Sequence, residues 1–443
     1  MNVTLNDRQQ GTPSATAADA NAPIGKADKY IWAVYIFLCI VSVLEIYSAS
    51  SREVTANNIF GPIIRQCIHL TIDTAIVLVV SRIHYRYFKS AIPLFIAVSV
   101  AMMAYVLVNG EIINGARRSL TLFGFQMQPS EMIKMSAVLG VALVMSLSQM
   151  PRGVTNRGVV ISAAIVIFCG GMLFSQGLTN TTLLMAISLS MMLIAGIQLK
   201  KFLIVCIVYG LAAGGGLLYK MRDKDKAEQE QQTTEQVATV TVKKDDEKTQ
   251  NRLGTWQERI NRYLGDSIPL YDQPITTKNR QEIYGYMAQA HGGLFGVLPG
   301  NSRETSRLPL AFSDYIYSIV VEDWGFVGGM FLLITYLSLL ARAGNIATRC
   351  SRVFPALLVL GMAVMIAFQA LFHMAIVTGV GPVSGQPLPM ISKGGSSMMV
   401  TALAFGIMLS VSRFAVRNGK KEDIKREKEA LPESLRADNP TQL

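Results

Sequence analysis

The sequence predicts an all-α, polytopic integral membrane protein with about ten transmembrane helices. Hydrophobic residues make up 51% of the 443 residues, charged residues make up 16%, and the mean hydropathy is +0.35. The apolar residues gather in runs of roughly 17 to 25, the length that a helix needs to cross a hydrocarbon layer about 30 Å thick. One long hydrophilic segment, residues 220–311, interrupts the series.

Each apolar run is interpreted as one transmembrane helix. The runs cover residues 29–49, 62–81, 91–109, 130–148, 157–175, 180–198, 201–219, 314–341, 353–379 and 395–413. The chain therefore divides into a disordered polar tail (1–28), helices one to seven (29–219), a large loop (220–311), helices eight to ten (312–413) and a second tail (414–443).

Basic side chains are unevenly shared between the two sets of short loops, and this asymmetry predicts the orientation. With a cytoplasmic N-terminus, the cytoplasmic segments carry most of them: Arg82, Arg86, Lys89, Arg152, Arg157, Lys200, Lys201, Arg342, Arg349, Arg352, Arg413, Arg417, Lys420 and Lys421. The opposite short loops carry only Arg52, Arg117, Arg118 and Lys393. Both termini are therefore expected in the cytoplasm, and the large loop outside. Because the charges are scattered over loops, the net charge of +11 does not indicate nucleic-acid binding.

The five cysteines do not suggest disulfide or metal chemistry. Cys39, Cys67, Cys169 and Cys206 fall inside apolar runs, and Cys350 lies in a predicted cytoplasmic loop. None lies in the large outer loop, so no structural disulfide is expected there. We interpret them as small apolar fillers.

The large loop has two parts of different composition. Residues 222–250 are dense in Lys, Asp, Glu, Gln and Thr, which predicts a disordered insertion. Residues 251–311 are predicted to be ordered. There, Trp256, Ile260 and Tyr263 recur at helical spacing, which indicates a short amphipathic helix on the membrane face.

The stretch from Phe368 to Ser397 begins as an apolar helix and then breaks at a series of glycines and prolines. Backbone of this kind at a membrane boundary cannot face lipid, because its amide groups would lack hydrogen-bond partners. It must line a cavity or pack against protein. A cavity lined by amides, hydroxyls and Lys393 suits a ligand that carries phosphate.

Four stretches carry a family resemblance: Gly115 through Glu131, Gly292 through Ser302, Ser313 through Gly325, and Phe368 through Ser397. In this order, with ten spans and the large loop after the seventh, they resemble the SEDS family (shape, elongation, division and sporulation), the FtsW and RodA group of membrane polymerases. Gly300-Asn301-Ser302 and the polar N-terminal tail resemble the division branch more than the elongation branch.

The resemblance implies a peptidoglycan glycosyltransferase that polymerises lipid II on the outer face of the bacterial cytoplasmic membrane, at the division septum. It also implies a class B penicillin-binding protein and other divisome proteins as partners, with undecaprenyl-pyrophosphate-linked glycan as the second lipid ligand. A divalent cation, Mg²⁺ or Mn²⁺, is left open as a cofactor, and no metal ligands are predicted.

Asp272 is the candidate general base. Polymerisation needs a base for the attacking 4-hydroxyl, and a loop carboxylate close to the membrane can supply it. In the family, the catalytic Asp precedes a Gln that opens the helix leading to the Gly-rich run. Gln281 matches that Gln, and Asp272 matches the acid. The spacing is somewhat longer than in the family, so Asp266 remains the alternative.

The other candidate site residues are predicted to bind the substrate: Arg117, Arg118, Glu131, Lys134, Gln281, Asp314, Lys393, Ser396 and Ser397. Guanidinium groups suit pyrophosphate oxygens, although interfacial anchoring of Arg117 and Arg118 is an equal alternative. Glu131 and Lys134 share a helix face at i, i+3, so they form either part of the site or a structural ion pair. Glu322 and Asp323 are expected to serve helix packing.

Four positions depart from the family pattern. The family's Glu and His before the eighth span are Leu310 and Phe312 here, a Tyr is Lys393, and an Asn of the ninth span is His373. We interpret His373 as a hydrogen-bonded packing residue. These departures bear on substrate contacts and leave the architecture unchanged.

A flippase or transporter of lipid-linked precursors is the main alternative to a glycosyltransferase, because broken helices and intramembrane acids occur there too. A non-catalytic scaffold that activates a transpeptidase is a third reading.

Overall fold

The computed structural model describes most of the predicted helical part of the chain. The described residues are 25–49, 60–113, 116–122, 125–150, 153–215, 273–276, 279–308, 311–350, 352–381, 385–393 and 395–415. Within these ranges, only the backbone path is described for residues 111–113, 116–119, 121–122 and 125–126. The predicted insertion over 222–250, the predicted amphipathic helix, and nearly all of the two predicted tails lie outside these ranges.

The protein is a polytopic all-α membrane protein, as predicted. The described spans are α2 (Lys29–Ala49), α3 (Gly61–Arg82), α4 (Tyr85–Asn109), α5 (Pro129–Leu147), α6 (Asn156–Phe174), α7 (Leu178–Ile194), residues 199–215, α11 (Ile316–Thr348), α12 (Val353–Val377) and α13 (Gly395–Phe414). Eight of them are long and apolar enough to cross a membrane, by length and composition. The α7 helix has 17 residues, about 26 Å at the rise of an α-helix, which is close to the hydrocarbon thickness.

Two helices extend well past their predicted runs, because helices continue beyond the hydrocarbon, whereas α7 ends at Ile194, before its predicted run does. The α4 helix begins at Tyr85 rather than near residue 91, and His84 caps it by accepting a hydrogen bond from the Arg86 amide at 3.2 Å. The α11 helix continues to Thr348, past the predicted end at 341. Hydropathy marks the buried middle of a helix and carries no signal for its polar ends.

Short strands occur in two of the loops, and the sequence analysis did not predict them. Strands β1 (Glu111–Ile113), β2 (Ala116–Leu122) and β3 (Phe125–Met127) form an antiparallel sheet in the order β1-β2-β3 between α4 and α5. Strands β4 (Gln149–Met150) and β5 (Gly153–Val154) form a second pair between α5 and α6. Such pairing satisfies backbone groups that would otherwise be exposed beside the membrane.

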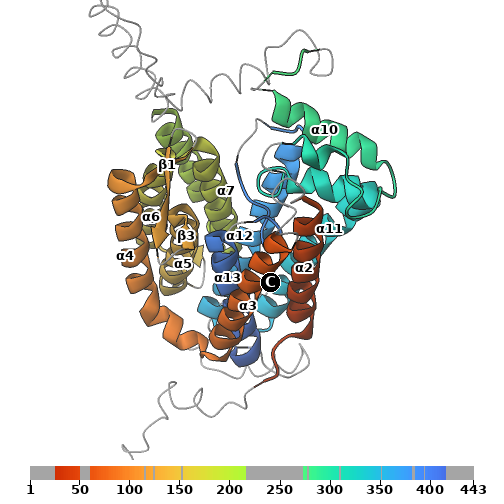
Figure 1. The fold of residues 1–443 in the computed structure, drawn as a ribbon. Coiled ribbons are helices and arrows are strands. Elements are labelled where there is room, and N and C mark those ends of the chain that lie inside the picture. The colour runs from red at the N-terminus through yellow and green to blue at the C-terminus, as the bar shows by residue number, and fades with distance from the viewer. Residues whose placement is uncertain are drawn as a thin grey trace, which may run out of the picture.

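The α12 helix occupies the centre of the bundle. In Figure 1 it lies between α4, α5 and α6 on one side and α10 and α11 on the other. In the apolar 18-residue stretch of α12, 94% of the residues are buried, compared with 22% in that of α4 and 28% in that of α3. The α3 and α4 helices therefore present most of their apolar surface to lipid, while α12 is surrounded by protein.

One end of the bundle is held together by Asp28. Its Oδ2 accepts hydrogen bonds from Arg342 Nε and Nη2 at 3.0 and 2.5 Å, while its Oδ1 accepts from the amides of Tyr30 and Ile31. The Asp28 amide donates to Ser412 Oγ at 3.2 Å. The start of α2 and the last turns of α11 and α13 therefore meet at this end, which we call the Asp28 end.

The opposite end carries α10 (Arg280–Gly292), which lies against α11 (Figure 1). We call it the α10 end. The helix opens next to Gln281 and leads into the Gly-rich run, as the family resemblance implies. After a short 3-10 turn, η2 (Glu304–Ser306), the chain enters α11.

The α11 helix kinks at Gly325, whose φ of 72° lies in the left-handed region. The kink frees backbone groups, and the loop after α10 pairs with them. The amides of Val297 and Leu298 donate to the carbonyls of Glu322 and Asp323 at 3.0 and 2.8 Å. In return, the Phe326 amide donates to the Gly293 carbonyl at 2.9 Å. The loop thus supplies hydrogen-bond partners to the backbone groups that the kink frees, as the interior of a membrane requires.

Gly325→Ala is expected to destabilise the protein by about 1 to 3 kcal/mol, because a left-handed conformation is strained for a residue with a Cβ. The added Cβ would also lie 2.3 Å from the Leu294 carbonyl oxygen. Gly344→Ala is the matched control on the same helix: its Cβ would meet nothing within 4 Å, and Ala favours a helix over Gly. The melting temperature in detergent should fall for Gly325→Ala and hold or rise for Gly344→Ala. Equal melting temperatures would contradict the kink as described.

Candidate functional site

The α5 helix begins at the α10 end with the sequence Gln-Pro-Ser-Glu. Pro129 occupies the first helical position, where its missing amide hydrogen costs nothing, and Glu131 lies in the first turn, near the positive end of the helix dipole. Lys134 follows one turn later and its Nζ lies 2.7 Å from Glu131 Oε1. The i, i+3 pair predicted from the sequence is therefore formed, and its side chains are only 5% and 1% exposed.

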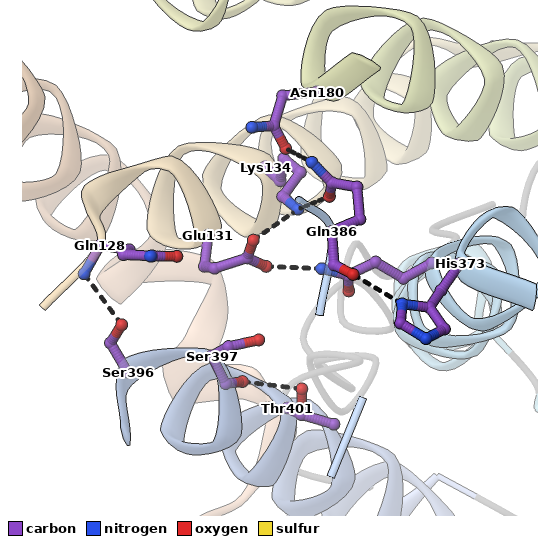
Figure 2. Close-up of polar contacts among 10 residues, drawn as sticks. Gln128, Glu131, Lys134, Asn180, His373, Gln386, Ser396, Ser397 and Thr401 are labelled. Carbon is purple, nitrogen blue, oxygen red and sulfur yellow. Dashed lines mark hydrogen bonds and ion pairs between the residues drawn. The ribbon is translucent and has the colours of Figure 1, made fainter. Parts of the chain in front are cut away.

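Three amides from distant parts of the chain complete the surroundings of this pair. Gln369 Nε2 of α12 donates to Glu131 Oε2 at 2.6 Å, and Lys134 Nζ donates to Gln386 Oε1 at 3.5 Å. Gln386 Nε2 in turn donates to Asn180 Oδ1 of α7 at 2.8 Å. Figure 2 shows Glu131, Lys134 and Gln386 directed toward one another between the helices. We call these five side chains the core polar network.

The core polar network is electrically balanced, and all its side chains are buried except that of Asn180, which is half-buried. A buried ion pair is tolerated only when further hydrogen bonds satisfy its remaining donors and acceptors, and the amides of Gln369 and Gln386 do so here. Both charges are engaged within the bundle in this state. The network therefore fixes α5, α7, α12 and the residues around Gln386 relative to one another.

His373 anchors the backbone of the same segment. Its Nδ1 lies 2.6 Å from the carbonyl oxygen of Gln386, and its side chain is buried in α12. The interpretation of His373 as a hydrogen-bonded packing residue is therefore confirmed. Gln386 is held at both its side chain and its main chain, which restricts the irregular segment that follows.

Residues 385–393 pack against protein, as predicted for non-helical backbone inside a membrane protein. Ser392 Oγ accepts a hydrogen bond from the Leu388 amide at 2.8 Å, and the Tyr336 hydroxyl donates to the Pro389 carbonyl at 2.6 Å. Residues 386 and 388–392 are buried. Residues 385–393 are therefore held in place by contacts within the segment and from α11.

The turn before α11 lies against this segment and brings Asp314 and Lys393 to the same end of the bundle. Ser392 Oγ donates to the Ser313 carbonyl at 2.8 Å, and the Lys393 amide donates to the Phe312 carbonyl at 2.9 Å. Asp314 Oδ1 accepts from Ser313 Oγ at 3.0 Å. We call residues 311–315 together with 385–393 the α10-end surface.

Two of the departures from the family pattern touch each other on this surface. Lys393 Nζ lies 4.6 Å from the centroid of the Phe312 ring, a cation–π contact. The contact places the ammonium group of Lys393 against the face of the Phe312 ring on the α10-end surface.

The paired serines at the start of α13 have structural partners. Ser396 Oγ accepts from the amide of Gln128 at 2.8 Å, which ties the start of α13 to the start of α5 (Figure 2). The Ser397 carbonyl accepts from Thr401 Oγ1 at 2.8 Å within the helix. Both serines are 5% exposed. The Ser396 hydroxyl proton is not used in the contact with Gln128.

The remaining candidates are placed less completely. Arg117 and Arg118 lie on β2, where Arg117 pairs with Ile112 of β1, and only their backbone is described. Gln281 is half-buried in the first turn of α10. Asp272 and Asp266 lie outside the described residues, so the choice between them remains a prediction.

In the described part of the chain, no group of three or more His, Cys, Asp or Glu side chains is arranged to hold a metal ion. No disulfide joins any of the five cysteines. Burial raises the pKa of the Cys350 thiol to about 12, so this cysteine stays protonated and unreactive.

Sequence reasoning missed Gln369, Gln386 and Asn180. Each is an uncharged amide in or beside an apolar span, and such a side chain must find a partner in the bundle. That signal marks the residues as interior. It does not identify partners that lie 238 and 206 positions away along the chain.

Comparison with known proteins agrees with this architecture. The family model FtsW/RodA/SpoVE, described as "Cell cycle protein", matches residues 28–230 and 256–417. Stage V sporulation protein E of Bacillus subtilis is 26% identical over 393 residues, covering 86% of this chain and 96% of the relative. A probable peptidoglycan glycosyltransferase FtsW of Trichlorobacter lovleyi is 28% identical over 396 residues, covering 88% and 94%.

Two solved structures share the fold. One, described as "Structural coordination of polymerization and crosslinking by a peptidoglycan synthase complex", has a TM-score of 0.65 at 21% identity and covers 88% of this chain and 99% of its own. The rod shape determining protein RodA of Thermus thermophilus has a TM-score of 0.58 at 20% identity, covering 88% and 98%. With the family model matched over most of its length, this chain belongs to the FtsW/RodA/SpoVE family of cell cycle proteins.

Proposed function

We propose that this protein is a peptidoglycan glycosyltransferase that polymerises lipid II into glycan strands on the outer face of the cytoplasmic membrane. Support comes from membership of the family and from relatives named as probable peptidoglycan glycosyltransferases. The α10 end is then the outer end, in agreement with the distribution of basic residues along the sequence.

The observation that carries the proposal is the α10-end surface. Its backbone is irregular, yet its residues are hydrogen-bonded to α5, α11 and α12, and it presents Lys393, against the Phe312 ring, beside the turn that carries Asp314. A surface with a cationic side chain at the membrane boundary suits the pyrophosphate of a polyprenyl-linked sugar. The large loop follows the seventh span and enters α10 at the same end.

The proposed chemistry is a displacement at the sugar carbon that bears the pyrophosphate. A loop carboxylate, Asp272 or its alternative Asp266, takes the proton from the 4-hydroxyl of the acceptor as that oxygen forms the new glycosidic bond. The bond to the pyrophosphate breaks, and the lipid pyrophosphate leaves with the electron pair. Cationic side chains stabilise the charge that develops on its oxygens. We assign this role to Lys393 and Arg118.

Partners and cofactor extend the same proposal. A class B penicillin-binding protein would crosslink the product, with other divisome proteins at the septum and both termini of this chain in the cytoplasm. Support for such a partner comes from the fold shared with a protein of a synthase complex. A divalent cation, if used, would be carried largely by pyrophosphate oxygens and waters with one or two carboxylates, since Mg²⁺ keeps much of its hydration shell.

Asp272→Asn should abolish polymerisation while leaving membrane insertion intact, because a carboxamide cannot accept the acceptor's proton. Asp266→Asn is the matched control and should remain active. The measurement is glycan strand formation from lipid II by purified protein with its transpeptidase partner. Loss of activity in Asp266→Asn alone would reverse the assignment. Full activity in both variants would contradict a loop carboxylate as base, and transport of lipid II without strand formation would favour a flippase.

Arg118→Ala should reduce turnover more than Arg118→Lys, because a guanidinium group binds two pyrophosphate oxygens and an ammonium group adds only a point charge. Lys393→Tyr should cause at most a modest loss, since the family has Tyr at this position. Lys393→Glu should be harmful through repulsion of the pyrophosphate. Polymerisation rate and lipid II binding are measured together. Near-normal polymerisation rates and lipid II binding for both Arg118→Ala and Lys393→Glu would show that the pyrophosphate binds elsewhere.

Lys134→Met should lower the yield of folded protein sharply, because removing one partner leaves Glu131 buried and uncompensated, at a cost of about 3 to 5 kcal/mol. The double variant Glu131→Gln/Lys134→Met removes both charges and should recover much of the melting temperature. Thermal unfolding in detergent distinguishes the two. If the double variant is less stable than Lys134→Met alone, Glu131 and Lys134 do not act as an ion pair that holds Gln386 in the core polar network.

A further inference from the structure

Glu322 of α11 makes more hydrogen bonds than helix packing requires. Its Oε1 lies 2.9 Å from His291 Nδ1 and accepts from the amides of Arg303 and Glu304 at 2.9 and 3.3 Å. Its Oε2 accepts from Ser302 Oγ at 2.6 Å. Ser302, Arg303 and Glu304 belong to the segment that follows α10, and His291 lies in the last turn of α10 itself. The expectation that Glu322 serves helix packing therefore describes it incompletely.

The carboxylate of Glu322 is fully buried. A buried carboxylate is stable only when several donors replace its hydration, and here they are supplied by the loop. Hydrogen bonds to an ionised acceptor are about twice as strong as neutral ones. Releasing the loop would leave the charge without these partners, so the carboxylate and the loop hold each other in place.

Asp323 provides an internal comparison. It is the next residue on the same helix and is equally buried, but neither of its carboxylate oxygens has a hydrogen-bond partner in the structure. Its main-chain carbonyl accepts from the Leu298 amide of the loop at 2.8 Å, and its carboxylate lies near Ser302. The two adjacent buried acids therefore differ in how they hold the loop: the side chain of Glu322 accepts hydrogen bonds from the amides of Arg303 and Glu304, and that of Asp323 accepts none from them.

The clamped loop is continuous with α10, a helix of 13 residues. Gln289, near the end of α10, donates to Ser318 Oγ of α11 at 3.1 Å and to the Val377 carbonyl of α12 at 2.9 Å. Glu322 then holds the residues from His291 to Glu304. With these contacts in place, α10 has one orientation on the bundle, and so has Gln281 in its first turn.

We propose that Glu322 is a positioning residue: its carboxylate clamps residues 291–304 onto the kinked α11 and thereby fixes α10 and Gln281 at the outer surface. The effect on catalysis rests on the proposed function, whereas the clamp itself does not. Because small misplacements at a reacting site cost large factors in rate, loosening α10 should lower turnover without removing any group that touches substrate.

Hydrogen exchange of the full chain in detergent tests the clamp directly. In Glu322→Ala, the amides of Arg303 and Glu304 lose their acceptor, and the peptide that contains them should exchange about tenfold faster or more. Asp323→Ala is the matched control, with the same kind of truncation at the next position and no loop acceptor removed. It should exchange like the wild-type chain. Glu322→Gln keeps an oxygen acceptor and should restore most of the protection.

Polymerisation of lipid II with the partner present tests the consequence. Glu322→Ala should lower kcat by about tenfold or more with little change in KM. Glu322→Gln should recover most of the rate, and Asp323→Ala should be close to wild type.

Three outcomes would overturn the inference. Unchanged exchange in Glu322→Ala would show that the carboxylate does not clamp the loop, and equally fast exchange in Asp323→Ala would show a general effect of truncation. Faster exchange in Glu322→Ala with a normal kcat would show that Glu322 holds the loop but does not position catalytic groups. If the wild-type chain forms no glycan, the proposed function fails separately, and the exchange experiment still decides whether Glu322 holds the loop.

Discussion

The structure depends on the burial of one ion pair, Glu131 with Lys134, inside a membrane bundle. Two charges in such a place require nearby partners for every remaining donor and acceptor. The amides that meet this requirement come from α12 and from the irregular segment after it. The pair therefore does more than join two positions of α5. It also binds the non-helical segment after α12 to the bundle, through the hydrogen bond from Lys134 to Gln386.

The same constraint governs the second break in regular structure. The α11 helix kinks at Gly325, and amides of the loop after α10 donate hydrogen bonds to the carbonyls that the kink frees. The Glu322 carboxylate in turn accepts hydrogen bonds from the same loop. Both breaks lie at the α10 end. At the Asp28 end, by contrast, the chain passes between α11 and α12 with few residues and no comparable insertion in the described ranges. Irregular, polar backbone is concentrated where a proposed outer-face substrate would bind.

The sequence predicts the features that depend on local pattern. Apolar runs predict the eight helices that are long and apolar enough to cross a membrane and the two shorter ones, α7 and residues 199–215. The i, i+3 spacing predicts the Glu131–Lys134 pair, and the family resemblance implies the helix that opens beside Gln281. Features that depend on tertiary contact were not predictable. Gln369 meets Glu131 across 238 positions, and the loop partners of Glu322 follow from a kink that hydropathy does not register. The contact between Phe312 and Lys393 joins two departures that look unrelated along the chain. The acid that the family pattern assigns as base lies outside the described residues, so its assignment still depends on that pattern.

In the proposed mechanism, the α10-end surface binds the pyrophosphate of the lipid substrate. The most direct test replaces Lys393 with the photoreactive p-benzoylphenylalanine, an aromatic side chain at a position where the family carries Tyr. The control places the same group at Gly344, which is near Arg342 at the opposite end and has open space for it. After illumination with labelled lipid II, the account predicts a crosslink at position 393 that excess unlabelled lipid II prevents, and none at position 344. A crosslink only at position 344, or equal crosslinks at both, would contradict the claim.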